Sequence, residues 1–138
     1  MLRFLITLID KMLQRESFLN IVDNTAVVTA RCLSNKYSYV GDILTCSTRA
    51  LRSINSRNKK LKLFSKGQII KCVILSSCFP VKRFGNIIYR SQFNTACILQ
   101  FRFKSFSPVG TRVKGIVFRE VGSLQKFKKL LSLCEYTF

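Results

Sequence analysis

The chain has 138 residues, and its 24 Lys and Arg against 6 Asp and Glu give a formal net charge of +18. A hydrophobic content of 48% excludes a disordered basic tail, and the length fits one domain with a modest core. Histidine is absent, which removes the commonest general base and metal ligand from hydrolytic and nuclease chemistry. The composition therefore predicts a folded basic protein that is not an enzyme and holds no cofactor.

The positive charge is concentrated in the middle of the chain. Between Asp42 and Glu120 there is no acidic residue, while sixteen residues are Lys or Arg. Because unbalanced charge destabilises a compact state by self-repulsion, we expect a polyanionic partner. Nucleic acid is the first expectation, and its binding should weaken steeply with salt because counterions are released. An acidic membrane surface and an acidic protein are the alternatives.

Residues 1–11 precede the first strand-like pattern. The apolar run from Phe4 to Ile9 is far shorter than the roughly 20 residues that span a bilayer, so no membrane span is predicted. The segment also lacks the Arg- and Ser-rich pattern of a transit peptide. We interpret residues 1–11 as a short extension that packs on itself or on a partner.

From about residue 18 onward, apolar residues follow the period of two that is typical of strands. Turn-forming Gly, Asn, Ser or Asp separate these strands, and many short strands predict a small closed β-barrel. In the expected strand 96–104, the odd-numbered residues from Cys97 to Phe103 are expected to face the core, and the other face becomes basic. The main expected strands are 27–33, 43–51, 68–75, 87–90 and 96–104. Segment 68–75 is nearly continuously apolar apart from Lys71, so it is expected to be buried on most of both faces.

The segment from Arg49 to Lys66 is rich in basic residues, Ser and Asn, and it has almost no apolar residue before Leu61. It predicts a projecting ribbon or loop whose Arg and Lys bind RNA phosphates while Ser and Asn bind riboses. A solvated loop without a partner is the alternative. The candidate RNA-binding residues of this segment are Arg49, Arg52, Arg57, Lys59, Lys60, Lys62 and Lys66.

A second basic turn runs from Val81 to Asn86 and predicts the tip of a hairpin. Lys82, Arg83 and, one short strand later, Arg90 are further candidate RNA-binding residues. Aromatic residues beside this turn, Phe79 and Phe84, are candidates for stacking on a base, with ordinary packing as the alternative.

Three isolated acidic residues, Asp23, Asp42 and Glu120, lie at turns, which indicates backbone capping and local salt bridges rather than a catalytic pair. The six cysteines form no Cys-x-x-Cys pair, and without histidine no metal site is expected. We expect free thiols that pack as small hydrophobes in a reducing compartment. A cysteine-dependent enzyme stays as an alternative, although it would lack a histidine to activate its thiol.

Near the C-terminus the apolar period becomes helical, and Ser123 is the candidate N-cap of the helix. The chain is thus divided into an N-terminal extension (1–11), a barrel with basic loops (12–118) and a C-terminal helical segment (119–138). The apolar stripe of the helix consists of Leu124, Phe127, Leu130, Leu131 and Cys134.

Six short blocks occur in one colinear order that covers about residue 12 to the end. They are Leu19–Thr25, Val40–Leu44, Lys66–Ile74, Ala96–Leu99, Pro108–Val113 and Lys126–Leu133. Together they resemble the family of the universal large-subunit ribosomal protein fourteen, in its bacterial and organellar form. The resemblance implies a five-stranded β-barrel with a projecting β-ribbon and short C-terminal α-helices.

The same resemblance implies a function. Members of this family are expected to bind large-subunit rRNA at the subunit interface, beside large-subunit ribosomal proteins three and nineteen. Their C-terminal loop region is expected to bridge to small-subunit rRNA and to receive the ribosome silencing factor. The matching positions here are Gly110, Thr111, Arg112 and Lys114. The alternative is a free-standing barrel for single-stranded nucleic acid, which would need exposed aromatics, whereas we expect most Phe on the apolar face.

The sequence departs from the family pattern at several points. After Asp23 and Asn24 the family has a small residue, Gly and then basic residues, whereas here Thr25 is followed by Ala26, Val27 and Val28. Residues 1–11 have no family counterpart. The divergence, together with many Phe, Ile, Ser and Asn as in an AT-rich genome, favours a mitochondrial ribosome, with a plastid ribosome as the alternative.

Overall fold

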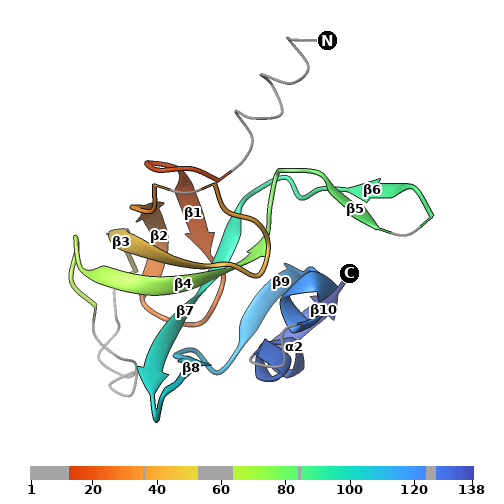
Figure 1. Ribbon diagram of the computed structural model, residues 1–138. Coiled ribbons are helices and arrows are strands. Elements are labelled where there is room, and N and C mark those ends of the chain that lie inside the picture. The colour runs from red at the N-terminus through yellow and green to blue at the C-terminus, as the bar shows by residue number, and fades with distance from the viewer. Residues whose placement is uncertain (1–12, 36, 53–63, 84, 124–126) are drawn as a thin grey trace.

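The computed structural model describes residues 13–35, 37–52, 64–83, 85–123 and 127–138 (Figure 1). The first half of the chain forms strands β1 (Phe18–Ile21), β2 (Val27–Cys32), β3 (Ile43–Leu51) and β4 (Ile69–Ser76). The next strands are β5 (Val81–Arg83), β6 (Ile87–Tyr89), β7 (Thr95–Arg102), β8 (Ser105–Pro108) and β9 (Val113–Val117). A 3-10 helix η1 (Arg119–Ser123), helix α2 (Lys128–Leu133) and strand β10 (Cys134–Thr137) follow.

Five strands close into a barrel in the order β1, β2, β3, β4 and β7, so the predicted five-stranded barrel is confirmed. Neighbouring strands are antiparallel, except that β1 and β7 pair in parallel, with Asn20 opposite Thr95. This last pairing joins the two edges of the sheet. The barrel therefore leaves no open edge between its first and last strands.

Two hydrophobic clusters share the strands β4 and β7. The barrel interior contains Ile70, Cys72 and Ile74 of β4, while Val73 and Leu75 point to a second cluster on the outer face. In β7, Ala96 and Ile98 likewise belong to the interior, and Cys97 and Leu99 to the outer cluster. Because side chains alternate across a strand, a strand buried on both faces reads as a continuous apolar run. This confirms the double burial predicted for β4.

The second cluster is covered by the C-terminal unit, in which β9 and β10 pair in parallel and pack with η1 and α2. Phe127 and Leu130 are buried there, as the helical stripe predicted. The predicted N-cap was wrong: Ser123 ends η1, and α2 begins at Lys128 after Phe127. Strand β10 was not predicted, because Cys134 fits the end of the helical stripe. In the structure, Cys134 begins β10, and the residues of β10 pair with β9.

The expected inner face of β7 was also partly wrong. Phe101 is 63% exposed and Phe103 is 99% exposed, because the strand runs beyond the barrel at this end and continues into a hairpin with β8. Alternation alone marks which residues share a face. It does not mark where along the strand that face stops being covered.

The cysteines are free thiols, and Cys32, Cys46, Cys72 and Cys97 are fully buried in the two clusters. Hydrogen bonding to Cys46 raises the pKa of the Cys32 thiol, and burial raises the pKa of Cys97 well above its usual value. These thiols stay protonated and pack as small hydrophobes, as expected.

No group of metal-ligating side chains occurs among the described residues. Within the same residues, no helix is long and apolar enough to cross a membrane.

Candidate nucleic-acid interface

The ribbon predicted at 49–66 is described only at its two ends. Arg49 and Arg52 are exposed at and just after the end of β3, and Lys66 is exposed in the turn before β4. Gly67 follows with a φ of +80°, a conformation that glycine adopts without strain, so this turn leads directly into β4. Four predicted residues, Arg57, Lys59, Lys60 and Lys62, lie outside the described residues.

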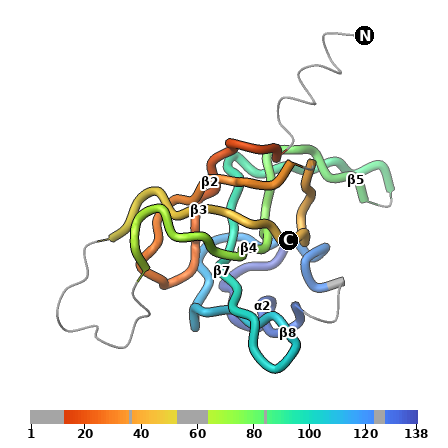
Figure 2. The backbone as a smooth tube through the Cα atoms, turned by 60° about the vertical axis from the view of Figure 1, so that its left-hand side comes forward, coloured from red at the N-terminus to blue at the C-terminus, as the bar shows by residue number. Residues whose placement is uncertain are grey.

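The second basic group lies on the β5–β6 hairpin, on the opposite side of the barrel from the end of β3 in both views (Figures 1 and 2). The hairpin predicted at 81–86 is confirmed, with Arg83 opposite Ile87. Lys82 and Arg90 are exposed. Those predicted RNA-binding residues that the structure describes are thus separated into distinct regions and do not form one patch.

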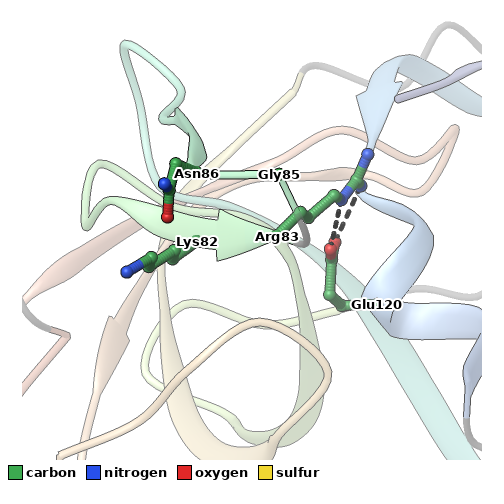
Figure 3. A pocket seen from close by; sticks show the side chains of 5 residues that line it. All are labelled: Lys82, Arg83, Gly85, Asn86 and Glu120. Atoms are coloured by element: carbon green, nitrogen blue, oxygen red, sulfur yellow. Dashed lines mark hydrogen bonds and ion pairs between the residues drawn. The ribbon is translucent and has the colours of Figure 1, made fainter.

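Beside this hairpin lies an open hollow of about 760 Å³, lined by Lys82, Arg83, Gly85, Asn86 and Glu120. In Figure 3, Arg83 and Glu120 point toward each other, whereas Lys82 points away from that pair. The two basic residues of β5 therefore have different environments. One faces a carboxylate, and the other faces solvent.

Arg83 binds Glu120 in a bidentate manner, with Nε at 2.6 Å from Oε1 and Nη2 at 3.0 Å from Oε2. Its guanidinium carbon lies 4.1 Å from the ring centroid of Tyr89, and the Tyr89 hydroxyl donates to the same carboxylate. Hydrogen bonding from Arg83 lowers the pKa of Glu120 to about 2, and burial together with Glu120 raises that of Tyr89 to about 12. Arg83 therefore ties the hairpin to η1.

The loop before β9 carries Gly110, Thr111 and Arg112, three of the residues matched to the intersubunit bridge, and Lys114 lies in β9 itself. Asn24 holds this loop: its side-chain nitrogen donates to Thr111 Oγ1 at 2.8 Å, and its Oδ1 accepts from the Thr111 backbone N–H at 2.9 Å. Gly110 permits this approach, because a Cβ there would lie 2.8 Å from Asn24 Oδ1. Thr111, Arg112 and Lys114 are exposed, so the clamp presents them to solvent.

Asp23, next to this clamp, is a fully buried carboxylate. It accepts hydrogen bonds from the backbone N–H groups of Thr25 at 3.1 Å and Ile98 at 3.0 Å, and from the Thr25 hydroxyl. Several donors satisfy the buried charge. Asp42 similarly accepts from the Tyr39 N–H at 2.9 Å. The predicted roles in backbone capping and salt bridges are thus confirmed for Asp23, Asp42 and Glu120.

The structure adds one basic group that the site prediction did not contain. Arg102, Phe103 and Lys104 form the exposed tip of the β7–β8 hairpin. The sequence carried no separate signal, because an odd-numbered Phe between two even-numbered basic residues fits the predicted alternation of an apolar and a basic face. Phe103 was therefore assigned to the core.

Aromatic exposure corrects a further expectation. Most described phenylalanines do not lie in the apolar clusters, so the expectation of Phe on the apolar face, which disfavoured a single-stranded nucleic-acid binder, was wrong. The buried ones are Phe64, Phe118 and Phe127, whereas the exposed ones are Phe18, Phe93, Phe101, Phe103 and Phe138.

Few acids balance the basic side chains. Among the described residues, two ion pairs join a base to an acid: Arg31 with Glu16 at 3.1 Å, and Arg83 with Glu120. Exposed basic side chains at the C-terminal end of β3, on β5, and at Arg112 and Lys114 face solvent instead. Such cations suit contact with phosphate oxygens.

Comparison with known proteins places this chain in a family. Residues 12–138 match the family described as ribosomal protein L14p/L23e. The chain is 34% identical over 133 residues to the large ribosomal subunit protein uL14m of Acanthamoeba castellanii, covering 91% of this chain and 99% of that protein. It is 32% identical over 117 residues to the uL14m of Acanthamoeba polyphaga, covering 80% and 97%.

The family match spans the barrel, both hairpins and the C-terminal unit, and the resemblance read from the six sequence blocks is confirmed. The family consists of structural constituents of the ribosome, which act in translation and are not enzymes. The chain belongs to the ribosomal protein L14p/L23e family.

Proposed function

We propose that this protein binds large-subunit rRNA at the subunit interface of a mitochondrial ribosome and contributes to a bridge with small-subunit rRNA. One observation carries the proposal: a chain that matches a ribosomal protein family over residues 12–138 has a formal net charge of +18. Two relatives carry the name large ribosomal subunit protein uL14m, which supports the large subunit and the mitochondrion. A plastid ribosome is the alternative.

The rRNA contact is assigned to the basic ends of the ribbon and to the free face of the β5–β6 hairpin. Arg49, Arg52 and Lys66 reach phosphates on one side of the barrel, and Arg57, Lys59, Lys60 and Lys62 remain proposed phosphate ligands from their charge. Lys82 and Arg90 do so on the other side. Folded RNA is recognised largely through shape and phosphates, so a rigid barrel with cations on separated regions can contact several RNA segments at once. Arg83 supports this surface by fixing the hairpin.

The bridge contact is assigned to Thr111, Arg112 and Lys114, held by Asn24 and permitted by Gly110. Large-subunit ribosomal proteins three and nineteen are the proposed neighbours, and the same loop is proposed to receive the ribosome silencing factor. Retention of silencing-factor binding after Arg112→Ala would contradict that last contact.

Sedimentation tests the main proposal. A tagged copy from organelle lysate should co-migrate with large subunits and assembled ribosomes on sucrose gradients, and ribonuclease should abolish this co-migration. A light peak that is lost at high salt would instead indicate a free nucleic-acid-binding protein. Co-migration of the tagged protein with ribosomes of the plastid fraction, and not with those of the mitochondrial fraction, would overturn the mitochondrial assignment.

The bridge is tested by subunit joining. Arg112→Ala should leave the variant in large subunits and raise the proportion of free subunits, because one phosphate ligand at the interface is lost. Gly110→Ala should act in the same direction, because the added Cβ pushes the loop away from Asn24. Lys128→Ala, an exposed change on α2, is the matched control and should not alter joining. Equal joining by all three variants would contradict the assignment.

A further inference from the structure

The tip of the β7–β8 hairpin combines features that the functions above do not use. Arg102 pairs with Ser105, so Phe103 and Lys104 are the two central residues of the turn. Their φ angles are +50° and +62°. Two positive φ angles in a two-residue hairpin loop match a type I′ turn, which favours Asn and Gly at these positions. Here a bulky aromatic and a long basic residue occupy them.

This choice of residues does not serve the fold. A side chain with a Cβ is sterically disfavoured at positive φ, and the penalty applies to both central residues. Phe103 gains no burial in return, because it is 99% exposed. Strained residues of this kind cluster at binding sites, where contacts with a partner offset the conformational strain. The strain and the exposure together indicate that the tip contacts a partner.

The surroundings of the tip indicate the chemistry of that partner. Below it, Phe101 and Phe106 pack across the hairpin with ring centroids 5.0 Å apart and ring planes inclined by 58°, which stiffens the hairpin. Phe101 and Arg102 also line a hollow of about 310 Å³ together with Lys71 and Gln100. None of the described residues that line this hollow is acidic. The Phe103 ring is carried by a stiff hairpin and flanked by cations. Such an arrangement is complementary to a nucleobase flanked by phosphates.

We propose that Phe103 stacks on an unpaired base of rRNA while Arg102 and Lys104 bind the flanking phosphates. The proposal rests on the rRNA-binding function proposed above and adds a base contact to it. A protein partner fits less well, because an apolar protein surface would leave Arg102 and Lys104 without a counter-charge, whereas a nucleotide has a π-face for the ring and flanking phosphates for the cations.

Binding of the full-length chain to purified large-subunit rRNA provides the first test. Phe103→Ala should weaken binding about five- to a hundred-fold, the usual range for one stacked base. Its dependence on salt should not change, because no charge is lost. Arg102→Ala should instead lower the log–log salt slope by about 0.7 to 0.9 for its one phosphate. Phe18→Ala, also an exposed phenylalanine, is the matched control and should bind as the unaltered chain does.

Side-chain replacements separate stacking from simple apolar contact. Phe103→Tyr should retain affinity, whereas Phe103→Leu, which keeps apolar bulk without a ring face, should behave like Phe103→Ala. Equal binding by Phe103→Ala and the unaltered chain would overturn the inference alone. Failure of the unaltered chain to bind large-subunit rRNA would overturn the proposed function itself.

A double change uncouples folding from binding. Phe103→Asn with Lys104→Gly supplies the residues that a type I′ turn prefers, so the free protein should melt at a higher temperature. The same protein should be lost from large subunits at lower salt than the unaltered chain. A lower melting temperature together with normal retention would contradict the inference.

The ribosome itself provides the last test. In large subunits assembled with Phe103→Ala, one or a few rRNA bases should become more reactive to base-specific chemical probes than in subunits with the unaltered chain. A photo-crosslinking amino acid at position 103 should cross-link to rRNA. A cross-link only to protein would show that the tip is a protein contact and would overturn the assignment to a base.

Discussion

The β5–β6 and β7–β8 hairpins place the same two kinds of side chain, arginine and aromatic, in opposite roles. On the first, Arg83 lies over Tyr89 and binds Glu120, so its charge is neutralised within the protein. On the second, Arg102 flanks an exposed Phe103, and no acidic residue lies opposite it in the hairpin register. The comparison shows that a carboxylate opposite the guanidinium decides whether such a group stabilises the fold or remains available for a partner.

The largest expected effect is on the first hairpin. Glu120→Ala should reduce the free energy of unfolding by about 1–2 kcal/mol, because a bidentate charged pair is lost from a site that is about one-third exposed. Thermal or denaturant unfolding measures this effect. Arg102→Ala is the matched change on the second hairpin, and a loss of stability as large as that of Glu120→Ala would remove the distinction between the two hairpins.

The pH dependence of stability should follow the same pair. The pKa of Glu120 is lowered to about 2 by Arg83, so its contribution is fully present above the ordinary pKa of 4.5. It declines as the pH falls below 4.5 and is lost near pH 2. The difference in stability between the unaltered chain and Glu120→Gln should shrink over this window. A difference that persists at pH 2 would mean that the carboxylate acts through packing instead of charge.

A smaller effect of opposite sign is expected on the second hairpin. Lys104→Gly should raise the free energy of unfolding by up to about 1 kcal/mol, because glycine relieves the steric strain of a residue with a φ of +62°. The melting temperature measures it. A glycine that destabilises the protein would show that the Lys104 side chain contributes to the fold.

The smallest effect on stability is expected for Arg102→Ala, whose consequence should lie in binding. Its melting temperature should stay within the range of ordinary surface changes, about 0.5 kcal/mol in either direction. The slope of rRNA affinity against salt should nevertheless decrease, as one phosphate contact is lost. Arg83→Ala should show the reverse pattern, with lower stability as its main result.

The barrel was predictable because its signals are local. Strand β3 was predicted with its observed bounds, and the double burial of β4 followed from a continuous apolar run. The C-terminal end was less predictable, since Cys134 fits a helical stripe equally well, and only pairing with β9 places it in a strand. A distant partner leaves no trace in the spacing of neighbouring residues.

The candidate site was predictable as chemistry but not as geometry. Charge alone marked Arg83 as a candidate RNA ligand, although Glu120, 37 positions away, faces it in the structure. Charge also gave no hint that Asn24 holds the Thr111 loop from 87 positions away. Phe103 was assigned to the core because alternation carries no information on where a strand leaves the barrel.

The parallel pairing of β1 with β7 has a consequence for biosynthesis. Asn20 cannot meet Thr95 until 75 further residues have been made, so the barrel can close only late in translation of its own chain. Until then one edge of β1 offers unpaired backbone groups. Non-local pairing of this kind slows folding, because the entropy of closing a long loop is lost before the strand contacts can stabilise the chain. The nascent protein should therefore depend on chaperones, or on early capture by RNA, during that interval.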